Sequence, residues 1–241
     1  KKVLRVIHQR RKYLPREGGR KLYNYLRPYL ASECIKLGRD KLFDLLRDHQ
    51  MLVEPRRKYK VTTNSRHRFH TYSNLVKDYK PKGPNNLWVS DITYLRTRSG
   101  FCYLALITDA YSRKIVGFDI SNSLELEGCV RALKKALKQL PTGQSLIHHS
   151  DRGIQYCSHR YTKMLKKNKI RISMAAKGNC YENALAERVN GILKDEFYLD
   201  YYFDNLKQVK QACRESIKLY NEKRFHLALQ MKTPDQVHQI A

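Results

Sequence analysis

Apolar side chains in the N-terminal part of the chain recur at the spacing of short amphipathic helices. Three such patterns cover residues 3–14, 20–30 and 39–52. Pro15 ends the first pattern, and Gly38 precedes the third. Two short helices joined by a brief connection, the second beginning with Arg39 and Lys41, predict a helix-turn-helix pair that binds DNA through these side chains. The alternative is a helical hairpin that only packs on its neighbours.

A polar stretch without helical or alternating periodicity follows the first region, which we assign to residues 1–54. Residues 55–84 are rich in basic side chains and predict a linker in which Arg56, Arg57 and Lys58 contact DNA. Its aromatic side chains either stack on nucleotides or hold the linker on the next domain. They are Tyr59, Phe69 and Tyr72.

Short apolar runs typical of strands begin after the linker. Strands are expected at 87–95, 101–108, 114–121, 145–151 and 170–176, and helices at 124–140, 158–168 and 182–197. The first three strands have short connections and predict an antiparallel meander. The order β-β-β-α-β-α-β-α predicts an α/β domain, residues 85–198, with a mixed five-stranded sheet flanked by helices.

A short helical tail, residues 199–241, is expected to pack on this domain. It contains a predicted helix at 206–221 and a helix start at Thr233-Pro234. Arg224 is expected to contact the DNA backbone.

The helix predicted at 182–197 carries one apolar side and one polar side. Leu185, Val189 and Ile192 mark the apolar side, and Glu187 lies roughly 200° away from it. The polar face also carries Asn183, Asn190, Gly191 and Lys194, with Arg188 beside it. Because amides and cations bind phosphate oxygens, we expect Asn183, Arg188, Asn190 and Lys194 to contact DNA.

The charge of the chain strengthens the expectation of a nucleic-acid partner. Lysine and arginine number 48 against 22 acidic residues, which leaves a net charge of +26. Such an excess indicates a polyanion, and no amphipathic segment favours a lipid surface; a generally basic soluble surface is the alternative. Six scattered cysteines without a C-x-x-C pair, no signal peptide and no apolar run long enough to span a membrane favour the cytoplasm.

Three carboxylates are the candidate chemistry. Asp91 and Asp151 each close a strand-like run, and Glu187 follows Asp151 at 187 − 151 = 36 positions, with 35 residues between them. We expect these three side chains to hold two Mg²⁺ ions, which stabilise the attacking and leaving oxygens in phosphodiester transfer. Any one of them alone is more simply a solvated surface acid.

Other titratable side chains near these acids are weaker candidates. His148 and His149 adjoin Asp151 and are either metal ligands or, more commonly, one buried histidine and one that points at solvent or substrate. Asp109 and Asp119 are explained by a turn and a strand interior.

Three segments resemble the catalytic core of retroviral-integrase-like transposases, in particular the second-reading-frame protein of two-frame bacterial insertion sequences. They are WVSDITY at 88–94, HHSDRGIQYCS at 148–158 and ENALAERVNGILKDE at 182–196. The resemblance implies an RNase H-like fold in which Asp91, Asp151 and Glu187 bind two Mg²⁺ or Mn²⁺ ions, with Asp91 shared by both. It further implies that Lys194 lies against DNA of the element end.

The resemblance also implies the reaction and the partners. Hydrolysis would free a 3′-OH at an element end, and that 3′-OH would attack another phosphodiester. The DNA partners would be the element ends and the target duplex, held by a homo-multimer, with an upstream-frame portion as a further partner. The zinc module that precedes the core in retroviral integrases is absent from this sequence.

Two other functional classes remain open on the sequence alone. One is a DNA-binding regulator that keeps the fold without catalysis. The other is a general RNase H-like nuclease or junction resolvase, against which the basic N-terminal region and the tail argue.

Overall fold

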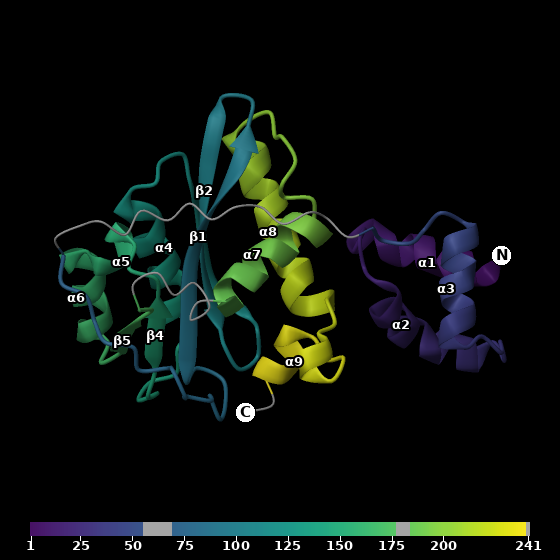
Figure 1. Ribbon diagram of the computed structural model, residues 1–241, viewed down its shortest axis with the longest axis horizontal. Coiled ribbons are helices and arrows are strands. Elements are labelled where there is room, and N and C mark those ends of the chain that lie inside the picture. The colour runs from purple at the N-terminus through teal and green to yellow at the C-terminus, as the bar shows by residue number, and fades with distance from the viewer. Residues whose placement is uncertain (55–68, 177–183, 240–241) are drawn as a thin grey trace.

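The computed structural model describes residues 1–54, 69–176 and 184–239 (Figure 1). Its N-terminal region contains three helices, α1 (Lys2–Tyr13), α2 (Gly19–Ser32) and α3 (Arg39–Asp48). They pack around a small apolar core of their own. Its fully buried members are Ile7, Leu22, Leu26, Leu42 and Leu46.

The predicted break after α2 is present, and α3 ends earlier than predicted. Cys34 and Gln50 adopt left-handed backbone conformations just beyond the two helices. The amides that follow them donate back across the helix ends, from Ile35 to the Leu30 carbonyl and from Met51 to the Leu46 carbonyl. These bonds give the carbonyls of Leu30 and Leu46 the hydrogen-bond donors that another helical turn would have supplied, so each helix can end here.

The predicted mixed five-stranded sheet is confirmed. Its strands are β1 (Leu87–Thr97), β2 (Gly100–Asp109), β3 (Ile115–Ser121), β4 (Ile147–Ser150) and β5 (Arg171–Met174). The order across the sheet is β3-β2-β1-β4-β5. The first three strands form the antiparallel meander, whereas β4 runs parallel to β1 and β5 runs parallel to β4.

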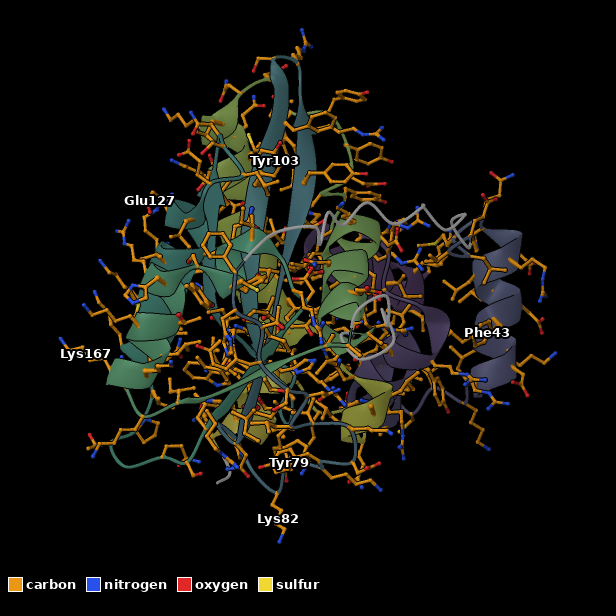
Figure 2. The ribbon with its side chains drawn as sticks, turned by 60° about the vertical axis from the view of Figure 1, so that its left-hand side comes forward. Phe43, Tyr79, Lys82, Tyr103, Glu127 and Lys167 are labelled. Carbon is orange, nitrogen blue, oxygen red and sulfur yellow. The ribbon has the colours of Figure 1, made fainter. Side chains whose placement is uncertain are left out.

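Helices cover both faces of the sheet (Figure 1). The helices α4 (Leu126–Leu137), α5 (Ile154–Cys157) and α6 (His159–Lys167) pack on one face around Trp88, and the short α5 was not predicted. The helices α7 (Ala184–Glu196) and α8 (Leu206–Lys223) pack on the other face around Leu104. Glu127 of α4 and Lys167 of α6 point outward from the covering layer (Figure 2).

The C-terminal tail packs against the sheet domain. After α8 come a short 3-10 helix (Leu227–Leu229) and α9 (Pro234–His238), which begins with a capping box between Thr233 and Gln236. The Asn221 side chain bonds both the N–H and the carbonyl of Ile115 at the start of β3. Leu14, just beyond α1, joins the same core as α7 and α8.

The expectation that Arg224 contacts DNA was wrong. Its side chain is buried, and its Nε and Nη2 both donate to the carboxylate of Glu196 at the end of α7. Arg224 therefore links the tail to α7. Within the described ranges, no helix is long and apolar enough to cross a membrane.

Candidate active site

The parallel pairing of β1 with β4 brings two of the predicted acids together. Ser90 of β1 pairs with Ser150 of β4, so Asp91 and Asp151 are the next residues on two adjacent strands. Asp151 directly follows β4, as predicted, but Asp91 lies in the middle of β1 rather than at its end. The strand continues to Thr97 because β2 pairs with it over its full length, whereas β4 stops at Ser150.

Asp91 is a mostly buried carboxylate held by two hydrogen bonds. Its Oδ1 accepts from the backbone N–H of Ile92 at 2.9 Å, and its Oδ2 accepts from Asn190 Nδ2 at 2.8 Å. The pKa of Asp91 is raised to about 7, mainly by burial and next by the negative charge of Asp151, with a smaller contribution from Glu187. The two hydrogen bonds oppose this rise only in part.

Asp151 is oriented by the turn that follows it. Its Oδ1 accepts from the Gly153 N–H at 2.9 Å. A Cβ added to Gly153 would lie only 3.0 Å from that oxygen, so the turn fits closely around the carboxylate. The short helix α5 begins immediately afterwards at Ile154.

Glu187 lies on the exposed side of α7, one helical turn before Asn190. The buried side of α7 differs from the prediction. It is formed by Ala186, Val189 and Leu193, while Leu185 and Ile192 are only partly buried. Asn190 belongs to this buried side, 6% exposed, because its amide is bonded to Asp91.

The three acids do not form a closed cluster. Among residues 1–54, 69–176 and 184–239, no three His, Cys, Asp or Glu side chains lie close enough together to hold a metal ion. The two aspartates are neighbours because of the sheet register. The interaction of Glu187 with Asp91 is a longer-range electrostatic repulsion, which raises the pKa of Asp91 slightly.

Lys194 lies beside this site. Its Nζ is 4.4 Å from the centre of the Tyr94 ring, and the charge of Asp91 reaches it. Burial lowers the pKa of Lys194, and the negative charges of Asp200 and Asp91 offset that effect only in part. Lys194, one of the predicted DNA contacts within the described residues, therefore borders both Asp91 and an aromatic side chain.

Apart from Asn190, which is bonded to Asp91, the other predicted DNA contacts are not shown next to the aspartates. Arg188 is exposed, and its positive charge acts to lower the pKa values of Tyr220 and His226 in the tail. Arg39 and Lys41 are exposed at the start of α3, where Arg39 is paired with Asp40 at 2.9 Å. Four others fall outside the described residues: Arg56, Arg57, Lys58 and Asn183.

Both histidines before Asp151 are buried, so the expectation that one of them points at solvent or substrate was wrong. Nε2 of His148 shares hydrogen bonds with Ser90 Oγ at 2.7 Å and Tyr161 Oη at 3.0 Å, and burial lowers the pKa of His148 to about 3. His149 Nδ1 lies 2.9 Å from Ser173 Oγ. Because neighbouring residues of β4 point to opposite faces and both faces are covered by helices, neither ring reaches solvent.

Asp109 and Asp119 have structural partners. Asp109 is fully buried and accepts hydrogen bonds from the Asn85 and Ser112 amides and from the Ser112 hydroxyl. Asp119 is paired with Arg131 and Lys135 of α4.

Replacing Asn190 tests how strongly it acts on Asp91. We expect Asn190→Leu to raise the proton affinity of Asp91 about tenfold or more, since a hydrogen bond to a charged acceptor contributes about 1.5–3 kcal/mol. The pKa of Asp91 would then rise from about 7. A carboxyl ¹³C NMR titration measures it, with Ile192→Leu on the same helix as the control. An unchanged pKa of Asp91 in a folded variant would contradict this assignment.

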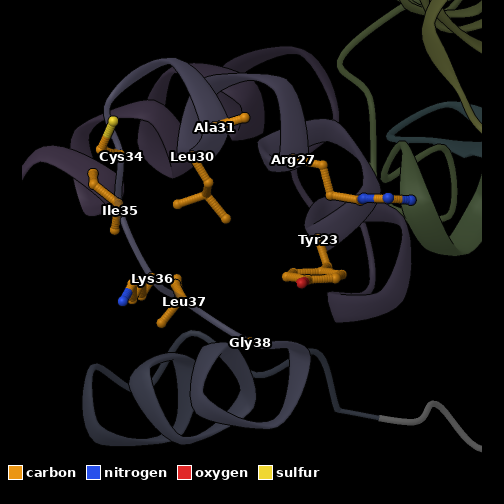
Figure 3. Close-up of a pocket in the computed structure, with 9 residues that line it drawn as sticks. All are labelled: Tyr23, Arg27, Leu30, Ala31, Cys34, Ile35, Lys36, Leu37 and Gly38. Atoms are coloured by element: carbon orange, nitrogen blue, oxygen red, sulfur yellow. The ribbon is translucent and has the colours of Figure 1, made fainter.

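A shallow hollow of about 610 Å³ lies in the N-terminal region, between α2 and the connection to α3 (Figure 3). Tyr23 and Arg27 border it on α2, and Ile35 and Leu37 on the connection. The aspartates are not among its lining residues.

Comparisons with known proteins agree with this arrangement. Residues 81–180 and residues 168–234 each match a family described as Integrase core domain. The chain is 37% identical over 222 residues to the insertion element IS600 uncharacterized 31 kDa protein of Shigella sonnei, covering 90% of this chain and 82% of that protein.

Two transposases of Escherichia coli (strain K12) are also similar. Transposase InsF for insertion sequence IS3A is 35% identical over 75% of this chain and 64% of its own length. The putative transposase InsK for insertion sequence element IS150 is 36% identical over 66% of this chain and 56% of its own length. The chain thus spans just over half to just under two thirds of these two proteins.

Solved structures share the fold. The HTLV-2 integrase catalytic core domain in complex with magnesium has a TM-score of 0.53 at 19% identity and covers 66% of this chain and all of that one. The simian T-cell lymphotropic virus intasome in complex with PP2A regulatory subunit B56 gamma gives a TM-score of 0.56 at 19% identity, over 93% of this chain and 72% of that one. The sheet domain therefore has the RNase H-like fold of integrase cores, and the chain belongs to the insertion-sequence transposases with an integrase core domain.

Proposed function

We propose that this chain cleaves DNA strands in a divalent-metal-dependent reaction and joins the freed 3′-OH to another phosphodiester during insertion-sequence transposition. The proposal rests on one observation: Asp91 of β1 and Asp151, which directly follows β4, come next after the paired Ser90 and Ser150 of these parallel strands. Two carboxylates placed together in a strongly basic protein suit phosphoryl-transfer chemistry better than they suit protein stability.

The residues present fit Mg²⁺, with Mn²⁺ as a substitute. Oxygen ligands are those that hard divalent cations prefer. The raised pKa of Asp91 reflects burial and repulsion from Asp151, both of which a bound cation would relieve. Asp91, Asp151 and Glu187 would hold two ions, with Asp91 shared; when bound, such ions stabilise charge on the attacking and leaving oxygens.

The chain's own side chains would position the DNA. Lys194, beside Asp91 and Tyr94, would meet a phosphate of the element end. We assign Arg188 and Asn183 to the same DNA face, and Arg39, Lys41, Arg56, Arg57 and Lys58 to DNA bound by the N-terminal region and linker. Asn190 is buried against Asp91 and would orient that carboxylate instead. The partners would be the element ends and target duplex, held by a homo-multimer together with an upstream-frame portion.

A labelled element-end duplex separates this function from a silent DNA-binding regulator. The purified chain with Mg²⁺ is expected to nick the labelled strand and to form joined products, and EDTA is expected to prevent both. Binding without nicking at any Mg²⁺ or Mn²⁺ concentration would favour the regulator. Nicking without joining would favour a general nuclease.

Metal binding should depend on pH through Asp91. Its pKa of about 7 means that a cation must displace a proton at lower pH. We therefore expect Mn²⁺ affinity to rise about tenfold per pH unit up to about pH 7 and to level off above it. Calorimetric titration without DNA measures this. Asp91→Asn should remove this dependence; an affinity of the wild-type chain that is flat across the range would contradict it.

A further inference from the structure

The far end of the β1–β2 hairpin extends beyond the helices that cover its face. In Figure 1 the two strands project past α4, and Tyr103 lies in this projecting part in Figure 2. Nearer the centre, Ile92 and Ala105 of the same face pack into the core around Trp88. Farther out, the exposed fraction rises, to 54% for Phe101.

The exposed end of this face is aromatic and basic. The register pairs Tyr94 with Tyr103 and Arg96 with Phe101, so all four side chains point to the same face. The Tyr94 and Phe101 rings meet edge to face, with centres 5.4 Å apart. Directly paired strands therefore present a continuous group of rings with one guanidinium among them.

A segment from beyond α7 adds a further ring. The Arg98 N–H donates to the Phe203 carbonyl, and the Phe203 N–H donates to the Arg96 carbonyl, so this segment lies against the hairpin. The adjacent Tyr202 is 70% exposed, and the Arg96 guanidinium lies 5.6 Å from its ring centre. The segment is thus attached by backbone bonds while its most exposed ring remains open to solvent.

Lys194 connects this group to the candidate active site. Because β4 ends opposite Ser90, the edge of β1 beyond it lies beside α7. Lys194 of α7 places its Nζ 4.4 Å from the Tyr94 ring centre, and the charge of Asp91 reaches the same ammonium group. We call the six residues Tyr94, Arg96, Phe101, Tyr103, Lys194 and Tyr202 the aromatic surface.

We propose that the aromatic surface binds unpaired nucleotides of a DNA strand next to the phosphodiester held at Asp91 and Asp151. The inference rests on the proposed function and specifies the form of its substrate. Rings and cations interleaved on one surface suit a single strand, since bases stack on the rings while the cations meet phosphates. In a duplex the bases are stacked on one another, so their faces are not available to the protein.

The charges around the surface are consistent with a polyanion. Of the acids nearby, Asp204 is bonded to Arg98 at 2.7 Å, and Asp200 acts on Lys194. An apolar partner would bury the Arg96 and Lys194 charges at a cost, whereas phosphates compensate them.

The test measures binding of a fluorescent oligothymidylate of about 12 nucleotides and of a blunt duplex of similar length, in EDTA. We expect Phe101→Ala and Tyr202→Ala each to weaken oligothymidylate binding at least about fivefold and to leave duplex binding within about twofold. Tyr111→Ala, an exposed tyrosine in the turn between β2 and β3, is the matched control. Phe101→Tyr should restore binding. Wild-type affinity for the oligothymidylate in both alanine variants would overturn the proposal.

A direct optical test uses the single tryptophan of the chain. Trp88 is fully buried, so Phe101→Trp places the chain's one exposed indole on the aromatic surface. Stacking of a base should quench its emission when oligothymidylate is added. No quenching at saturation would overturn the proposal. Light scattering provides a second test: if Phe101→Ala dissociates a dimer but still binds oligothymidylate, the aromatic surface is a contact between protein copies and the proposal is overturned. Because no metal is present, these results are separate from any failure of strand cleavage.

Discussion

Asp151→Asn is expected to reduce strand cleavage and joining about a thousandfold or more while leaving DNA affinity nearly unchanged. The substitution keeps the shape of the side chain and its capacity to accept from the Gly153 N–H, so the turn before α5 should persist. It removes the charge that adjoins Asp91 in the sheet register. Loss of a carboxylate ligand to a catalytic cation costs several kcal/mol of transition-state stabilisation, and about 4 kcal/mol corresponds to a thousandfold in rate.

Glu187→Gln should give a loss of similar size if α7 contributes the third ligand. The matched control is Glu127→Gln, because Glu127 of α4 is also an exposed helical glutamate but is paired with Arg160 of α6. Cleavage and joining are measured on a labelled element-end duplex with Mg²⁺, and affinity is measured on the same duplex by anisotropy. Cleavage by Asp151→Asn within tenfold of the wild-type rate would refute the assignment of that carboxylate.

Glu196→Ala is expected to destabilise the protein by about 3–5 kcal/mol, because it leaves buried cations without their partner. Glu196 ends α7 and receives hydrogen bonds from Arg224 of the tail, at 2.9 and 2.5 Å, and from Lys21 of α2, at 3.0 Å. The Arg224 side chain is only 6% exposed. One carboxylate thus connects the N-terminal helices, the tail and the helix that carries Glu187.

The pH dependence of this contribution follows from the pKa of Glu196. Burial acts to raise that pKa, but the hydrogen bonds and charges of Arg224 and Lys21 outweigh it, so the pKa lies below its ordinary value of 4.5. The stabilisation is therefore complete above about pH 4.5 and is lost as the pH falls through the lowered pKa. Urea unfolding at pH 7 and at lower pH measures it.

Lys21→Met is the matched control for this cluster. Burial lowers the pKa of Lys21, as does the charge of Arg224, and Glu196 only partly offsets these effects. Removing this cation should therefore cost much less than removing Glu196, whereas Arg224→Ala should approach the cost of Glu196→Ala. Equal losses for Lys21→Met and Glu196→Ala would mean that the cluster does not stabilise the fold through Arg224.

Much of the fold could be predicted from periodicity, and the misses have local causes. The five strands and the long helices follow from runs whose apolar spacing matches strand or helix geometry. The helix α5 was missed because its four residues are too short to show a period. The buried side of α7 was misjudged because Asn190 is polar yet buried, a placement that only its bond to Asp91 explains.

The sequence by itself determined the secondary structure pattern, the basic charge and the identity and spacing of Asp91, Asp151 and Glu187. Only the tertiary structure decided which of these acids are neighbours, because the pairing of β1 with β4 joins segments far apart in the chain. The same holds for the link from Lys21 through Glu196 to Arg224 and for the aromatic surface. Local spacing governs which residues share a strand or helix face, whereas packing between distant elements governs which faces meet, and no local pattern encodes that choice.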